Sequence, residues 1–426
     1  MKNAPPRWMK LDNAAKIYPA AKRKDWTAMF RVSADLTEEI DPVVLDKALS
    51  STIARFPSFS LRLRRGVFWY YLEHIDGHPD IQKDVNNPCV RLNPSENKRF
   101  AFRVRYYNKR IAVEIIHVLA DGTGGLCFLK TLVAEYLCLK YGAQIPRGDT
   151  ILDCGTAASK EEYEDGYIGH ARYFSQSRVG STAYHITGTN ETDGFNNITT
   201  GIIPIENILA KAKEKGVSLT EYLVAVMLLS IDKLQRSRCP NERKLRPVKV
   251  NIPVNLRRFF PSKTMRNFAN YVTPGIEPKL GMYTLDETLK LVHHFMGLEV
   301  TEKTLNTKIT TNVRSEQNPV FRVVPLFIKN AAMKIAFNLV GDRQSSTTLS
   351  NLGAVKLPAE MERYVTRLDF IIGPLSRNRV VCAAISYKDK LFLNITRAIE
   401  EPYFEHEFYT RLVKLGIPVK IESNQR

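Results

Sequence analysis

The chain has 426 residues, of which 44% are hydrophobic and 10% aromatic, and its formal net charge is +18. These proportions are typical of a globular protein, and a length above about 300 residues favours two lobes over a single core. No apolar run reaches the ~18 residues of a membrane helix and the first residues lack the apolar core of a secretory signal, so a cytoplasmic protein is expected.

The positive charge favours acidic or phosphorylated partners without choosing among them. Basic residues are spread along the chain and no nucleic-acid-binding motif is present, so no nucleic-acid partner is expected. The six cysteines form no CxxC pair, which argues against both a zinc site and a disulfide framework. His74 and His78 have the spacing of metal ligands but no third ligand, so no metal is predicted.

Hydrophobic patterning predicts that the first half begins with a strand, a helix and two hairpins. The helix starts at Asp41-Pro42, where an N-cap residue precedes a proline at the first helical position. The expected segments are a strand over 25–33, the helix to residue 55, and hairpins over 61–72 and 100–116.

The stretch 110–141 then predicts an apolar strand, a polar turn and a long helix. The β-branched run 111–116 indicates a strand that ends at His117. Imidazole is the side chain whose ordinary pKa, ~6.5, lets it take a proton near neutral pH, so His117 is a candidate general base. Asp121 either orients this histidine or holds the turn.

The turn contains three glycines, Gly122, Gly124 and Gly125, which are expected to adopt backbone conformations closed to other residues. Thr123 is predicted to be the N-cap of the helix, and Gly142 is predicted to end it.

Residues 142–197 are rich in glycine, serine, threonine and charge, and mark the crossover between two halves. Strands are then expected over 198–203, 248–254, 347–352, 366–372, 380–387 and 391–397, and helices over 204–215, 218–235, 284–314, 319–340 and 402–415. This alternation predicts an α/β (α+β) protein with an N-terminal lobe, 1–170, and a C-terminal lobe, 171–426.

The segment HVLADG, His117 to Gly122, resembles the HxxxDG motif of the chloramphenicol acetyltransferase-like acyltransferases. The segment IPVNLR, ending at Arg257, resembles the family's second-lobe strand that ends in an arginine. Ser350-Asn351-Leu352-Gly353 resembles the SNLG segment of the alcohol acetyltransferase branch. The three occur in the family's order, so the resemblance covers nearly the whole chain. It implies two similar lobes, each a mixed sheet packed with helices, and a tunnel between them.

The resemblance also implies a role for each matched residue. His117 would be the general base in the tunnel, and Asp121 would be a structural carboxylate paired with Arg257 of the other lobe. Ser350 and Asn351 either donate hydrogen bonds to the developing oxyanion or end a strand.

Gly122 would permit the turn. Arg257 has an alternative reading as a surface cation, and His117 one as an inert histidine at a strand end.

An enzyme of this kind would move an acyl group, expected to be acetyl, from acyl-CoA or an acyl carrier protein to a small hydroxyl-bearing acceptor, without a permanently bound cofactor. Ile116 stands where some relatives carry a second histidine, which weakens the resemblance to condensation domains and wax ester synthases. The plant-type DFGWG segment is replaced by residues 369–373, DFIIG. Two alternatives remain open: a carrier-protein-dependent or condensation-type enzyme, and a non-catalytic binding relative. Peripheral contact with an anionic membrane surface also stays open.

Overall fold

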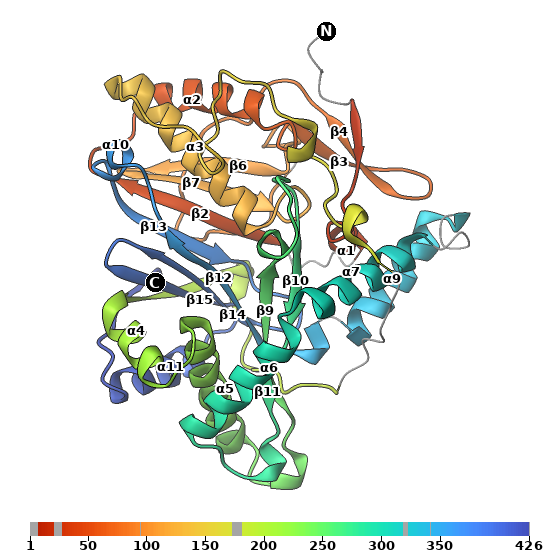
Figure 1. Ribbon diagram of the computed structural model, residues 1–426, viewed down its shortest axis with the longest axis vertical. Helices are drawn as coiled ribbons and strands as arrows, with labels where there is room; N and C mark the ends of the chain where they lie inside the picture. Colours follow the sequence, from red (N-terminus) through yellow and green to blue (C-terminus); the bar gives the residue numbers. More distant parts are fainter. Residues whose placement is uncertain are drawn as a thin grey trace.

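The computed structural model describes residues 7–20, 28–93, 95–172, 181–317, 323–340 and 342–425, and within them the chain forms sheets of five, eight and three strands. The five-stranded sheet and the eight-stranded sheet each form the centre of one lobe, with helices packed on them (Figure 1). The mixed α/β fold in two lobes that the sequence predicts is therefore confirmed.

The first lobe is built on the five-stranded sheet, in the order β13-β2-β7-β6-β5. Its strands are β2 (Met29–Leu36), β5 (Gln82–Lys83), β6 (Phe102–Tyr107), β7 (Arg110–Ile116) and β13 (Val365–Ile372), and its helices are α2 (Pro42–Arg55), α3 (Gly122–Tyr141) and α10 (Ala359–Glu362). Helices α2 and α3 lie side by side over this sheet (Figure 1).

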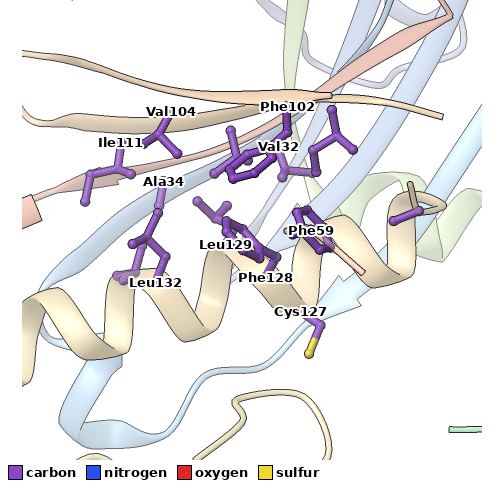
Figure 2. Close-up of a cluster of buried hydrophobic side chains, with 14 of the residues drawn as sticks. Val32, Ala34, Phe59, Phe102, Val104, Ile111, Cys127, Phe128, Leu129 and Leu132 are labelled. Atoms are coloured by element: carbon purple, nitrogen blue, oxygen red, sulfur yellow. The ribbon is translucent and has the colours of Figure 1, made fainter. Parts of the chain in front are cut away.

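The core of the first lobe lies between α3 and the sheet. Phe128 of α3 stacks on Phe59 with ring centroids 4.2 Å apart, and Phe102 of β6 meets both rings edge-on (Figure 2). Such buried aromatic pairs contribute about 0.5–1.5 kcal/mol each beyond the area they bury. This packing fixes α3 on the strands that lead into it.

Strand β7 carries one buried charge. The carboxylate of Glu114 accepts hydrogen bonds from Arg103 Nε at 2.6 Å, Arg31 Nη1 at 3.2 Å and the backbone N–H of Cys89 at 3.1 Å. Because a buried carboxylate needs such partners, these contacts hold the register of β7, and β7 ends beside the candidate base.

The second lobe is built on the eight-stranded sheet, in the order β10-β9-β12-β14-β15-β8-β16, with β11 also paired to β9. Its strands are β8 (Asn197–Pro204), β9 (Val248–Asn255), β10 (Ala269–Val272), β11 (Gly275–Ile276), β12 (Thr347–Val355), β14 (Val380–Tyr387), β15 (Lys390–Arg397) and β16 (Lys420–Ser423). Its helices are α4 (Ile205–Glu214), α5 (Leu219–Arg238), α6 (Leu285–Glu299), α7 (Glu302–Gln317) and α11 (Tyr403–Lys414). Helices α4, α5 and α11 lie on the side of this sheet away from the first lobe (Figure 1).

A smaller sheet, in the order β1-β4-β3, joins β1 (Trp8–Lys10) to the hairpin of β3 (Leu61–Arg65) and β4 (Tyr70–His74). Beside it lies α9 (Leu326–Val340), whose first backbone N–H bonds the carbonyl of Val67 at 2.9 Å, and α9 packs on α1 (Ile17–Ala20). None of the described helices combines the length and the apolarity that crossing a bilayer requires.

Strand β13 joins the two lobes. The chain leaves the second sheet after β12, pairs antiparallel with β2 of the first sheet, and then returns to the second sheet as β14. The first sheet is therefore completed by a strand from the second half of the chain. The lobe boundary near residue 170 stays a prediction, because residues 173–180 lie outside the described part.

Some predicted boundaries are wrong. The helix expected over 284–314 is two helices, α6 and α7, because the chain breaks at Val300 and the Thr301 hydroxyl accepts from the backbone N–H of Thr304 at 3.3 Å, as an N-cap does. The strand expected over 25–33 begins at Met29, and its residues 25–27 lie outside the described part, as do residues 319–322 of the helix expected over 319–340.

Candidate active site

His117 lies at the end of β7, where the strand turns toward α3. Its backbone N–H bonds the carbonyl of Ala28 at 2.9 Å, and the preceding residue, Ile116, pairs with Met29 of β2. The N–H of Leu119 closes the turn on the carbonyl of Ile116 at 2.9 Å. The histidine backbone is therefore held by the sheet on one side and by a tight turn on the other.

The His117 ring is held by two aromatic rings. Tyr18 of α1 stacks on it with ring centroids 5.3 Å apart, and Phe30 of β2 lies 4.7 Å from it. Nδ1 is buried and has no hydrogen-bond partner among the described residues. Burial lowers the pKa of His117 below its usual 6.5, and the charge of Asp121 opposes this only in part.

The Asp121 carboxylate connects the turn to the second lobe. One oxygen accepts the backbone N–H of Gly124 at 3.0 Å. The other accepts Nη1 of Arg257 at 2.7 Å and the backbone N–H of Phe268 at 2.9 Å. Asp121 thus holds the turn, and it acts on His117 through its charge.

Asp121, and not Thr123, is the N-cap of α3. The prediction of Thr123 is wrong because the aspartate two residues earlier accepts the backbone N–H of Gly124, the third residue of the helix. The Thr123 hydroxyl instead accepts Nδ2 of Asn255 at 3.2 Å, which is a further contact between the lobes. The predicted end of the helix at Gly142 is confirmed, since that residue has a φ of 65°.

Arg257 follows β9 and is largely buried. Besides Asp121, its guanidinium donates to the carbonyls of Thr264 at 3.0 Å and Arg266 at 2.6 Å. Its own N–H bonds the side chain of Asn255 at 3.1 Å. The arginine therefore fixes the loop 264–268 against the turn that follows the histidine.

The glycines of the turn are needed for space. None of Gly122, Gly124 and Gly125 has a positive φ, so the expectation of special backbone conformations is wrong. A Cβ on Gly124 would lie 2.0 Å from the carbonyl oxygen of Met265. A Cβ on Gly122 would lie 2.7 Å from a methyl of Leu352, and a Cβ on Gly125 would lie 2.5 Å from the ring of Phe30.

Asn267 and Tyr18 are two site residues that the sequence does not reveal. Nδ2 of Asn267 donates to the backbone carbonyl of His117 at 2.8 Å and to Asp12 at 3.1 Å. Neither Asn267 nor Tyr18 lies in a motif or a periodic segment, and both reach the site through folding. A conserved position among relatives is the signal that would have found them.

Ser350 and Asn351 have different surroundings in β12. The Asn351 side chain accepts from Gly353 N at 2.8 Å and donates to Thr220 at the start of α5 at 3.1 Å, so its amide is engaged locally. Ser350 is half-buried. Leu352, two residues later, lies in a register shift of β12, and its side chain packs against Gly122 at the start of α3.

The structure therefore brings Asp121, Gly122 and Arg257 together in one contact network beside His117, while the roles of these residues stay predictions. Within the described part of the chain, no three His, Cys, Asp or Glu side chains gather as metal ligands would. The tunnel at His117 also stays a prediction.

Comparison with known proteins identifies the fold. The model of the alcohol acetyltransferase family matches residues 189–394, and no curated protein sequence matches the chain. Polyketide synthase associated protein 5 from Mycobacterium tuberculosis aligns at 14% identity over 96% of this chain and 98% of its own, with a TM-score of 0.61.

Two structures from Fusarium sporotrichioides align as well. TRI3 trichothecene 15-O-acetyltransferase aligns at 11% identity over 96% of this chain and 94% of its own, with a TM-score of 0.60. TRI101, complexed with coenzyme A and T-2, aligns at 11% identity over 98% and 100%, with a TM-score of 0.62. Such identities establish a shared fold, and with the family match they confirm the resemblance noted in the sequence.

The Asp121–Arg257 pair is expected to stabilise the protein strongly. Asp121→Ala and Arg257→Ala should each lower the free energy of unfolding by about 3–5 kcal/mol, because each leaves a buried charge without its partner. Chemical denaturation of both variants and of the double variant measures this, and the double variant should lose less than the sum.

The control is the exposed pair Lys263–Glu161, 3.4 Å apart, whose removal should cost less than about 1 kcal/mol. Additive losses at Asp121 and Arg257 would contradict the coupling.

Gly124→Ala should destabilise the protein by about 1–3 kcal/mol, because the new methyl group would overlap the Met265 carbonyl. Gly297→Ala is the matched control: that glycine lies in α6 with nothing within 4 Å of a Cβ, so alanine should be neutral or stabilising there. Melting temperatures of the two variants test this, and equal shifts would be inconsistent with the close approach.

Proposed function

Because the chain matches the alcohol acetyltransferase family over residues 189–394 and has the fold of these acyltransferases, we propose that it is an O-acyltransferase. It moves an acyl group, acetyl in the first instance, from the thioester of acyl-CoA to the hydroxyl of a small alcohol. His117 is the general base. Two structural neighbours support this assignment: one is a 15-O-acetyltransferase and the other was solved with coenzyme A.

The observation that carries the proposal is the state of the His117 ring. It is held at a strand end next to the contact between the lobes, between two aromatic rings, and burial keeps its pKa below 6.5. An imidazole with a lowered pKa is neutral at pH 7 and ready to accept a proton. With Nδ1 buried, we assign the proton transfer to Nε2.

The reaction then needs no acyl-enzyme. Nε2 of His117 takes the proton of the acceptor hydroxyl while that oxygen attacks the thioester carbonyl carbon, and the carbonyl oxygen becomes an oxyanion. The carbon–sulfur bond breaks as the oxyanion collapses, and the imidazolium returns its proton to the departing thiolate. The products are an ester and a free thiol.

The neighbouring residues have supporting roles in this scheme. Asp121 and Arg257 hold the turn that follows the base, as their mutual contact indicates. Ser350 is the better candidate for a donor to the oxyanion, because the amide of Asn351 already bonds Thr220. In other acyl-transfer enzymes such a donor contributes about 3–4 kcal/mol to transition-state stabilisation.

A second candidate keeps the chemistry and changes the donor. The fold is shared with polyketide synthase associated protein 5, whose name associates it with a polyketide synthase. An acyl carrier protein would supply the thioester in that case. The net charge of +18 suits an acidic carrier as well as the phosphates of coenzyme A.

His117→Ala should lower kcat by at least about 100-fold, the usual contribution of a general base. The assay measures acyl transfer from a panel of acyl-CoAs and acyl carrier proteins to alcohols, and the release of free thiol reports the rate. His294→Ala is the control, because His294 is exposed on α6, and it should leave kcat unchanged. Equal turnover in parent and His117→Ala would refute the assignment. If the parent protein binds acyl donors but transfers no acyl group, it is a non-catalytic relative.

The pH dependence follows from the lowered pKa of His117. The neutral imidazole is the active form, so kcat/KM should be flat above pH 6.5 and fall only below it, as one proton binds. Initial rates between pH 5 and 9 measure the profile, with a stable acceptor such as a primary alcohol. A midpoint above pH 7 would show that the active group is not this buried imidazole.

A further inference from the structure

The second lobe has a cavity of about 230 Å³ between two loops. One loop, 375–379, connects β13 to β14, and the other, 185–190, precedes β8. The cavity, termed the Ser376 pocket below, is lined by His185, Ile186, Thr187, Gly188, Asn190, Ser376, Arg377 and Arg379.

The Ser376 pocket is framed by buried hydrogen bonds. Asn378 is 1% exposed. Its side-chain oxygen contacts Nδ1 of His185 at 3.1 Å, and its Nδ2 donates to the Ser345 hydroxyl at 2.9 Å. The N–H of Leu375 closes the loop on the carbonyl of Asn378 at 3.0 Å. The walls of the pocket are therefore fixed before anything enters it.

Two buried polar atoms at the pocket have no partner among the described residues. They are the hydroxyl oxygen of Ser376, a residue that is 6% exposed, and Nε2 of His185. A buried polar group without a hydrogen bond costs about 1–3 kcal/mol. An anionic ligand would accept from the Ser376 hydroxyl, and its charge would favour protonation of Nε2, which could then donate to the same ligand.

The charge of the pocket is positive. Arg377 and Arg379 line it. Burial lowers the pKa of His185, and the charges of Arg377, Arg246 and Arg343 lower it further. The nearby carboxylate of Glu401 accepts the backbone N–H and the hydroxyl of Thr189. An anion is therefore the ligand that this environment favours.

The pocket lies toward the same end of the first sheet as His117. The N–H of Gly373, at the end of β13, bonds the carbonyl of Met29 at 2.9 Å, and Met29 pairs with Ile116, the residue before His117. Ser376 is three residues beyond Gly373, so their Cα atoms are at most ~11 Å apart. A long flexible thioester arm can therefore extend from the pocket toward the base.

We propose that the Ser376 pocket binds a phosphate group of the phosphopantetheine-bearing acyl donor. Arg377 and Arg379 neutralise the phosphate and the Ser376 hydroxyl donates to it. In the neutral ring His185 carries its proton on Nδ1, which faces the Asn378 side-chain oxygen, so Nε2 takes up a proton from water as the anion binds and then donates to the phosphate. This inference rests on the thioester-dependent function proposed above. The chemistry is common to coenzyme A and to a carrier protein, which both join pantetheine to a phosphate.

The test is calorimetric titration of the full chain with coenzyme A, 4′-phosphopantetheine and pantetheine. Ser376→Ala should weaken the binding of coenzyme A and phosphopantetheine about tenfold, the loss of one charge-assisted hydrogen bond. Arg377→Ala/Arg379→Ala removes two charges and should weaken it by more. The Kd of pantetheine, which has no phosphate, should not change. Arg65→Ala, in the exposed β3–β4 hairpin, is the control and should bind all three like the parent.

A phosphopantetheinyl carrier domain is titrated in parallel. Weaker binding of coenzyme A alone in the variants assigns the pocket to the nucleotide donor, and weaker binding of the carrier alone assigns it to the carrier. Equal Kd values for parent, variants and control with every phosphate-bearing probe would overturn the inference.

The titrations need no acyl group, so they separate this inference from the proposed reaction. If no donor supports transfer but the variants bind coenzyme A more weakly, the phosphate-binding role of the pocket is supported and the proposed acyl transfer is refuted. If transfer occurs and both variants keep the parental KM for every donor that supports it, acetyl-CoA and acyl carrier alike, the proposed reaction is supported and the pocket is refuted.

Discussion

The carboxylate of Asp121 is the contact on which the site depends. Its two oxygens receive three donors, from the start of α3, from Arg257 and from the backbone of Phe268. A buried charge is tolerated only when it is matched in this way. One side chain thereby fixes where a helix begins in the first lobe and where a loop lies in the second.

Arg257 also helps to hold His117 in place, and the loop 264–268 links the two residues. The loop 264–268, held by Arg257, carries Asn267, and its amide bonds the carbonyl of His117. The ring itself is positioned by Tyr18 and Phe30, which also remove it from water. Polar contacts thus hold the backbone of the candidate base, while two aromatic side chains lie against its ring. Burial lowers its pKa, and the charge of Asp121 opposes this in part.

Local signals in the sequence predict most of the elements correctly. The β-branched run of β7, the cap at Asp41 and the glycine that ends α3 are each decided by residues within a few positions, and the structure shows all three. The three family segments also indicate the fold and bring Asp121 and Arg257 into one hypothesis, because the resemblance carries information about distant parts of the chain.

The remaining features depend on contacts far away in sequence. Thr123 and Asp121 are both acceptable caps by local rules. Local rules also do not show that the capping carboxylate receives two more donors, from residues more than 130 positions later. The turn glycine Gly124 has an ordinary backbone, and its requirement appears only when the carbonyl of Met265 lies against it. Sequence patterns also do not show that β13 joins the first sheet, since its period is that of any buried strand.

The path of β13 bears on how this protein is made. On the ribosome, β2 emerges early but remains an open sheet edge until some 330 further residues, up to the end of β13, have been synthesised. An unpaired edge strand readily associates with other chains. The nascent first lobe therefore passes through a long interval in which it depends on rapid completion of translation, or on a chaperone, to avoid aggregation.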